Sequence, residues 1–215
     1  GLIVFQATFT AHLEADRRAA ARRVDFFALS LEAQLARNEA LPGLLALEGR
    51  LAALLDADSP ATRDAANRYL EAAVHSADVS AAYLMDDAGL TLAASNWNRP
   101  ITFVGHRYAY RPYFQDATAG RFGRFYGIGA TTGEAGYFLA SRIRTGGGRE
   151  GVIAVKVALE PFEAAMRQSG EAVFVADREG VVLLSAVPAW KYRVLQPVPA
   201  ATRERLAATR QYGGM

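Results

Sequence analysis

The 215-residue chain contains no cysteine, only two lysines against 22 arginines, and three histidines. Without cysteine, neither a disulfide nor a thiolate metal site can form. His12, His75 and His106 are scattered along the chain, and nothing in the pattern suggests that they converge on a metal ion. We therefore expect no metal site and no other cofactor.

The chain also lacks an uninterrupted apolar run long enough to span a membrane. It nevertheless opens with Gly1-Leu2-Ile3-Val4-Phe5, and apolar residues continue to Phe9. Either the tail of a membrane helix or the first turn of a soluble helix would produce such a stretch. The sequence does not decide between these two interpretations.

The chain has no large excess of positive or negative charge, because its formal net charge is only +2. This balance argues weakly against a nucleic-acid partner. Positive charge is concentrated locally, with eight arginines against three acidic residues between Arg99 and Glu150. The concentration suggests an anionic ligand, although most of these arginines fit a solvated basic face equally well.

A catalytic constellation is missing too. There is no nucleophile-elbow serine, and no pair of acids can be placed near a histidine. His106, beside Arg107, fits a loop surface better than a general base. We expect this chain to have no enzymatic activity of its own.

The first third of the sequence predicts helices. Residues 8–40 read as one long helix of ~45 Å, a length that suits a spine or a dimer helix. Its inward stripe should contain Val24, Phe27, Ala28, Leu31 and Leu35. A second helix should begin at Pro42, and a third should run from Ser59-Pro60, as N-cap and first turn, to about Ser76. The leucines expected on one side of the second helix are Leu44, Leu47, Leu51, Leu54 and Leu55.

From about residue 82 the apolar residues follow the alternating pattern that is typical of strands. Strands are expected over residues 82–85, 90–95, 124–131, 137–143 and 151–159, with a short helix from Pro112 to about Ala119 and another from Pro161 to about Gln168. Five antiparallel strands with helices on one side predict an α+β fold.

A weak internal repeat relates residues 83–92 to residues 174–183 at a constant offset of 91. Both copies read as strand, Asp-x-x-Gly turn, and strand, and each follows a predicted helix. Such a repeat suggests two tandem copies of one fold. The second copy has only 44 residues from Ala172 to the end of the sequence, so we expect it to be incomplete.

Lys156 is the most unusual single residue. Along the strand 151–159 it alternates with Ile153, Val155 and Val157, so it faces the other way, between two alanines. An ammonium group in such a place needs a counter-ion. We prefer a ligand carboxylate in that role, because the small neighbours leave room; the alternative is an edge-strand lysine that prevents aggregation.

Three further elements offer partners for an anion. Arg111 precedes the helix-starting Pro112, and its guanidinium can grip a carboxylate with two hydrogen bonds. Tyr108, Tyr110 and Tyr113 surround it, although one or two of them should simply pack in the core. Thr131 and Thr132 end a predicted strand beside glycines. Their hydroxyls and the exposed backbone N–H groups of the glycines offer a second anion-binding position. Two cationic seats on one sheet suit a small molecule with two carboxylates.

These segments together resemble a known family. They are Ala94-Ser95-Asn96-Trp97-Asn98, Phe103-Val104-Gly105, Tyr108-Ala109-Tyr110-Arg111-Pro112-Tyr113-Phe114, Gly129-Ala130-Thr131-Thr132-Gly133, Gly136-Tyr137-Phe138-Leu139 and Val155-Lys156-Val157. Six weak motifs in the same order form a specific signal. From about Leu41 to the end, including Trp190-Lys191-Tyr192-Arg193, the sequence resembles the periplasmic sensor region of the C4-dicarboxylate sensor histidine kinases of the DctB type.

The resemblance implies tandem PAS-like (double Cache, or PDC) domains with antiparallel sheets on a long N-terminal helix. Residues 1–78 would form the helical spine, residues 79–168 the membrane-distal ligand-binding domain, and residues 169–215 the start of a truncated membrane-proximal domain. The family's ligand arginine and tyrosine fall on Arg111 and Tyr113, its threonine on Thr131 or Thr132, and its lysine on Lys156. Tyr126 and Tyr137 are weaker matches to ligand positions of the family.

The function implied is that of an extracytoplasmic, periplasmic sensor domain of an inner-membrane histidine kinase. It would bind succinate, fumarate or malate and form a homodimer through the N-terminal helix. The alternative is the ligand-binding domain of a chemoreceptor or kinase that recognises another small carboxylate or an amino acid. An amino acid's ammonium would need an acid in the pocket, and neither Asp116 nor Glu134 falls in a motif placed there.

Overall fold

The structure is a computed structural model that describes residues 2–213, with side chains described for residue 14 and residues 16–213. Gly1 and the side chains of the rest of the apolar opening stretch lie outside this part. Within the described residues, no helix combines the length and the apolar character needed to cross a membrane.

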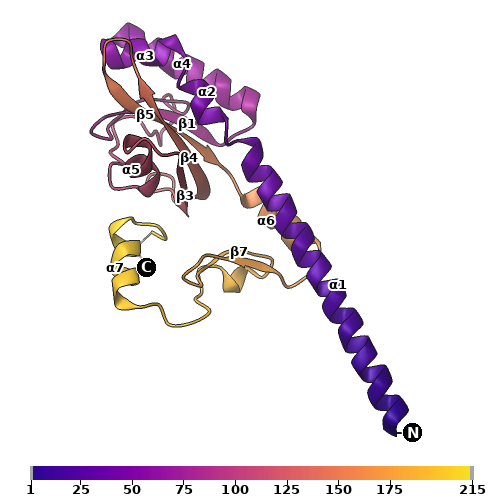
Figure 1. Cartoon of the computed structure of the whole chain (residues 1–215). Coiled ribbons are helices and arrows are strands. Elements are labelled where there is room, and N and C mark those ends of the chain that lie inside the picture. Colours follow the sequence, from indigo (N-terminus) through magenta and orange to yellow (C-terminus); the bar gives the residue numbers. More distant parts are fainter. Residues whose placement is uncertain (1, 214–215) are drawn as a thin grey trace.

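The long N-terminal helix α1 runs from Leu2 to Arg37. At 36 residues it is about 54 Å long, and its N-terminal half projects beyond the rest of the molecule (Figure 1). Phe27, Leu31 and Leu35 pack inward as predicted. Val24 is 57% exposed and Ala28 is exposed too, so the expected stripe is wrong at these two positions.

The helix expected from Pro42 is instead two short helices, α2 (Leu41–Leu45) and α3 (Gly49–Asp56). The Glu48 side chain caps α3 by accepting a hydrogen bond from the Arg50 N–H. This break rotates the inward face, so Leu45 is buried while Leu44 and Leu47 are 62% and 82% exposed. A single apolar face through all five leucines was therefore a wrong prediction.

Helix α4 (Pro60–Ala77) begins where the sequence predicted. The Ser59 hydroxyl accepts from the Thr62 N–H, and the Thr62 hydroxyl accepts from the Ser59 N–H, which forms a capping box. Pro60 occupies the first turn. The helix ends at Asp78 in the left-handed conformation, from which the chain enters the sheet.

Five antiparallel strands form the central sheet in the order β2-β1-β5-β4-β3. The strands are β1 (Ala81–Asp86), β2 (Thr91–Ala94), β3 (Gly123–Ile128), β4 (Ala135–Arg144) and β5 (Glu150–Val157). The α+β fold class is confirmed. Strand β3 ends three residues earlier than predicted, so Thr131 and Thr132 lie in the following loop.

Both faces of the sheet are covered. One face packs against α2, α3 and α4 through Leu45, Leu51, Leu54, Ala66 and Leu70. The other face packs against the loop after β2 and against α5 (Pro112–Thr118), through Phe103, Tyr108, Tyr113, Phe114 and Ala117. The expectation of helices on one side only was thus incomplete, because the loop and α5 bring their own apolar side chains to the second face.

The remaining elements form a smaller unit below the sheet (Figure 1). They are α6 (Glu160–Gln168), β6 (Phe174–Ala176), β7 (Val182–Ser185), the 3-10 helix η1 (Pro188–Trp190) and α7 (Ala200–Ala208). Strands β6 and β7 pair into a two-stranded sheet. Their apolar side chains share a core with α1, where the rings of Phe27 and Phe162 meet edge to face at 6.3 Å.

The two copies of the internal repeat form the same hydrogen bonds in their turns. Asp86 and Asp177 each accept, through Oδ1, from the N–H four residues later, and each donates its own N–H to the carbonyl of that residue. Gly89 and Gly180 have φ values of +76° and +79°, which glycine adopts without strain. The same turn therefore recurs 91 residues later. The division into domains at residues 78 and 168 stays a prediction.

Candidate ligand-binding site

Lys156 lies on β5, the middle strand of the five, and only 2% of its surface is exposed. The alternative of an edge-strand lysine is therefore wrong. Its Nζ lies 3.3 Å from the Thr132 hydroxyl and 3.2 Å from the Glu134 carboxylate. The lysine thus reaches the loop that follows β3, as the sequence predicted for Thr132.

Arg111 is the N-cap residue of α5 and is equally buried, with 2% of its surface exposed. Its Nη2 donates to the Ile128 carbonyl at 2.8 Å, and its Nη1 donates to the carbonyls of Thr209 and Arg210 at 3.2 and 3.1 Å. The rings of Tyr110 and Phe125 lie 5.3 and 5.4 Å from the guanidinium carbon. These described partners are neutral carbonyls, and a carboxylate accepts stronger hydrogen bonds from a guanidinium.

The loop of residues 129–134 connects the two cations. Arg111 donates to Ile128, the last residue of β3 just before the loop, and Lys156 bonds Thr132 and Glu134 within it. The Gly129 N–H donates to the Glu134 carbonyl, which closes the loop, and Gly133 turns it with φ of +70°. Two buried positive side chains therefore approach one short loop from two elements. Such an arrangement can hold a small anion with two charged ends.

Two tyrosines of the motif lie on the same face of the sheet as Lys156. The Tyr108 hydroxyl shares a hydrogen bond of 2.5 Å with the Thr131 hydroxyl, so both predicted residues meet in the structure. The Tyr113 hydroxyl shares one of 2.7 Å with the Tyr83 hydroxyl. Burial raises the pKa of Tyr108 to about 12 and that of Tyr113 further, so both phenols stay protonated and can donate.

Tyr126 and Tyr137 do not join this group. They face each other across β3 and β4, whereas their neighbours Phe125 and Phe138 take the Lys156 side. Successive side chains of a strand point to opposite faces, so both tyrosines point away from the site. The Tyr126 hydroxyl donates instead to the Leu183 carbonyl at 2.9 Å. In the structure, Tyr126 and Tyr137 therefore lie on the opposite face of the sheet from Lys156, not beside it.

Two residues beside the site were missed by sequence reasoning. Glu134 was set aside because it lay outside the motifs, yet its carboxylate is the acid nearest to Lys156 among the described residues. It follows Thr132 by two positions in the same loop, which was an available signal. Tyr83 could have been found from strand alternation, because Ala81 pairs with Lys156 and Tyr83 lies two residues further along β1.

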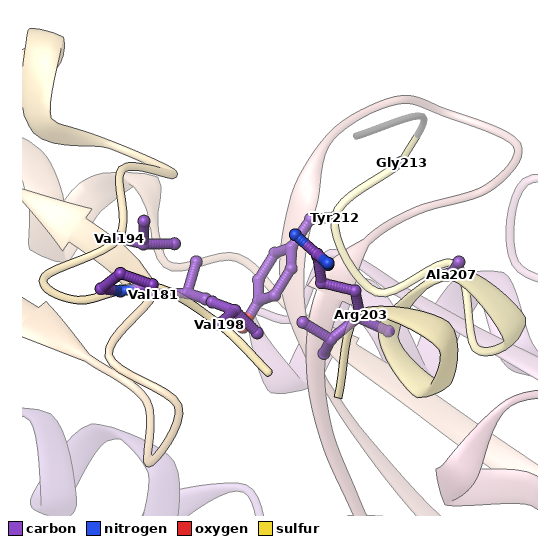
Figure 2. Close-up of a pocket in the computed structure, with 9 residues that line it drawn as sticks. Val181, Val194, Val198, Arg203, Ala207, Tyr212 and Gly213 are labelled. Atoms are coloured by element: carbon purple, nitrogen blue, oxygen red, sulfur yellow. The ribbon is translucent and has the colours of Figure 1, made fainter. Parts of the chain in front are cut away.

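A separate pocket of about 390 Å³ lies among the C-terminal elements (Figure 2). Its walls come mainly from the β7 start, the segment after η1, α7 and the C-terminal turn, and comprise Val181, Val194, Pro197, Val198, Arg203, Leu206, Ala207, Tyr212 and Gly213. None of the predicted ligand residues lines it. This apolar pocket is distinct from the Arg111–Lys156 region.

Known proteins share the sequence and the fold. No family model matches the chain. The C4-dicarboxylate transport sensor protein DctB of Rhizobium meliloti is 36% identical over 182 residues, which cover 84% of this chain. DctB of Pseudomonas aeruginosa is 35% identical over 190 residues, or 88% of the chain. The chain is homologous to DctB-type sensor proteins. It spans only 29% and 31% of the length of these two relatives.

Solved structures agree with this homology. The sensor domain of the Vibrio cholerae histidine kinase DctB superposes with a TM-score of 0.86 at 29% identity, covering 92% of this chain and 77% of that one. The ligand-binding domain of the P. aeruginosa amino acid chemoreceptor PctC, solved with GABA, reaches a TM-score of 0.60 at 24% identity, covering 81% and 80%. The second likeness concerns the fold alone. The chain has the architecture of a DctB sensor domain.

Proposed function

We propose that this chain is the extracytoplasmic sensor region of a two-component histidine kinase, that it binds a C4-dicarboxylate such as succinate, fumarate or malate, and that it signals across a membrane. The observation that carries the proposal is the pair Arg111 and Lys156, each 2% exposed, at one loop of a DctB-like fold. Buried cations are costly unless a negative group neutralises them. A dicarboxylate would supply one carboxylate to Arg111, whose described partners are neutral carbonyls, and one to Lys156 in place of Glu134.

The binding mode follows from the chemistry of the two cations. Arg111 would exchange backbone carbonyls for a carboxylate that accepts two parallel hydrogen bonds. Lys156 and Thr132 would hold the second carboxylate. The protonated hydroxyl of Tyr108 is bonded to the neighbouring Thr131 and would be a further donor. Hydrogen bonds to charged groups contribute about 1.5–3 kcal/mol each. The ligand would thus bridge α5, β5 and the loop between β3 and β4.

Titration calorimetry with succinate, fumarate and malate tests the proposal. Arg111→Ala and Lys156→Ala should each weaken binding by at least about tenfold, since each removes a charge-assisted hydrogen bond. Arg121→Ala is the matched control, because Arg121 belongs to the same basic stretch but pairs with Asp116 at the surface. Wild-type affinity in both site variants would contradict the assignment of the site.

A second candidate function has one specific observation behind it. Glu134 lies 3.2 Å from Lys156, so the site contains an acid that could accept the ammonium of an amino acid. Succinate and aspartate differ only by that ammonium group, so they form a matched pair of ligands. Aspartate binding ten times more tightly than succinate would favour an amino-acid sensor over a dicarboxylate sensor.

Dimerisation through α1 is part of the same proposal. Phe26 and Leu29 lie one helical turn apart and are 65% and 66% exposed. A second copy of α1 would cover them, and Phe26→Glu should then shift sedimentation velocity profiles towards the monomer. Arg18→Glu, on the solvated part of the same helix, serves as the control. A wild-type chain that remains monomeric at high concentration would contradict this part.

The location is testable in the whole protein. Alkaline phosphatase needs disulfides, so it folds only in an oxidising compartment. Inserted at the exposed turn of residues 146–148, it should be active in cells if this region is periplasmic. Inactive insertions, together with an active cytoplasmic reporter at the same position, would place the region inside the cell.

A further inference from the structure

The ion pair between Lys156 and Glu134 is unusually asymmetric. The Lys156 side chain is 2% exposed, whereas the Glu134 side chain is 72% exposed. The Lys156 ammonium would have to leave a packed environment to reach water, whereas the Glu134 carboxylate is already largely hydrated and can leave with little cost in hydration. Movement of Glu134 is therefore the less costly way to open the pair.

The surroundings hold Lys156 in one place. A Cβ added to Gly136 would lie 2.7 Å from Lys156 Cε, and one added to Gly129 would lie 3.7 Å from Nζ. The lysine therefore runs against bare backbone on β4 and at the end of β3. Glu134, by contrast, follows Gly133, a glycine in the left-handed conformation, which is the residue type with the greatest backbone freedom.

We propose that Glu134 is an internal competitor that occupies the seat of one ligand carboxylate at Lys156 and so sets the affinity of the site. This inference rests on the function proposed above. When a dicarboxylate enters, its carboxylate replaces that of Glu134 on the Lys156 ammonium and beside the Thr132 hydroxyl. One carboxylate is exchanged for another, and Glu134 swings into water without leaving a buried charge unpaired.

Two consequences follow for ligand recognition. The seat is charge-neutral before binding, so a group without negative charge gains nothing from entering it and Glu134 stays in place. The cost of displacing Glu134 also lowers the apparent affinity of every ligand that uses Lys156. If the pair is closed about nine-tenths of the time, the apparent affinity is reduced roughly tenfold.

The test is titration of succinate into Glu134→Gln. The amide keeps the size and the backbone hydrogen bonds of the loop but cannot neutralise the ammonium, so succinate should bind about three- to tenfold more tightly. Glu150→Gln is the control, because Glu150 lies on the same strand about 20 Å from Lys156 and pairs with Arg144. It removes the same charge without touching the seat and should change affinity less than twofold.

The outcomes separate the two proposals. Unchanged or weaker succinate binding in Glu134→Gln, with normal binding by the wild-type chain, overturns the competitor role and leaves the dicarboxylate site in place. An equal gain in Glu150→Gln overturns it as well, because a general change of charge would then explain the result. If the wild-type chain and both variants bind none of the dicarboxylates, the proposed function itself fails.

Discussion

The Lys156 stem runs close to the backbone at Gly136, and this makes Gly136 a sensitive residue. A Cβ at Gly136 would lie 2.7 Å from Lys156 Cε and 2.9 Å from Cγ. Gly136→Ala should therefore displace the lysine stem, lower the free energy of unfolding by about 1–3 kcal/mol, and weaken succinate binding at least tenfold. Calorimetry and thermal melts measure both effects.

Gly133→Asn is the control for this substitution. Gly133 has open space where a Cβ would stand, and asparagine tolerates its left-handed conformation. We expect Gly133→Asn to leave the free energy of unfolding and the affinity for succinate nearly unchanged. Succinate binding by Gly136→Ala at wild-type affinity would show that the observed position of Lys156 is not required.

Tyr83 and Tyr113 form a second residue-scale test, because their hydroxyls hydrogen-bond each other at 2.7 Å in the core. Replacing one tyrosine by phenylalanine leaves the other hydroxyl buried and without this partner, which costs about 1–3 kcal/mol. The double variant Tyr83→Phe/Tyr113→Phe removes both polar groups, so its loss should be smaller than the sum of the two single losses. Denaturant unfolding of all four proteins measures the difference, and strict additivity would contradict the hydrogen bond.

At the scale of elements, α4 supports the edge strand β2 through one side chain. The Asn67 Oδ1, on the buried face of α4, accepts from the Ala94 N–H at 2.9 Å. Asn67→Ala should lower the free energy of unfolding by about 1–3 kcal/mol, because it leaves a buried N–H unpaired. Asp64→Ala, one turn earlier on the exposed side of α4, should cost less than about 1 kcal/mol. Equal losses in the two variants would contradict this role of Asn67.

The elements were largely predictable from local pattern. The helix starts at Pro60, Pro112 and the residue before Pro161 agree with the sequence signals, because proline and the Ser59 cap act within one turn. The α2–α3 break was not predicted, because the leucines keep a helical spacing across it. The break depends on the Glu48 side chain, which caps the start of α3, and on burial of Leu45 against the sheet.

At the scale of the whole molecule, the buried tyrosines predict loss of stability in alkali. Burial is the main cause that raises the pKa values of Tyr83, Tyr108, Tyr113, Tyr126 and Tyr212 above 10. Above pH 10 the unfolded chain releases these phenolic protons while the folded chain keeps them, so the folded state binds more protons. The free energy of unfolding should then fall by up to about 1.4 kcal/mol per pH unit for each tyrosine.

Thermal melts between pH 8 and pH 11.5 measure this dependence. The melting temperature should be nearly level up to about pH 9.5 and fall beyond it, which is the direction required when folded-state pKa values are raised. The Tyr83→Phe/Tyr113→Phe variant should show a shallower fall, since two of the titrating groups are gone. A level profile up to pH 11.5 would mean that these phenols titrate alike in the folded and unfolded chains.

Local spacing along the chain was enough to predict the five strands of the sheet and the repeated Asp-x-x-Gly turn, because alternation and turn chemistry act over a few residues. It left open whether Lys156 lies on a central or an edge strand, and the strand order decided this. Local spacing was also enough to select Arg111, Tyr108 and the two threonines as one group. Only the tertiary structure showed that Arg111 donates to Thr209 and Arg210, which are 98 and 99 residues away along the chain. Only the fold placed Glu134 on Lys156 and turned Tyr126 and Tyr137 to the opposite face, because such contacts depend on how separate elements pack.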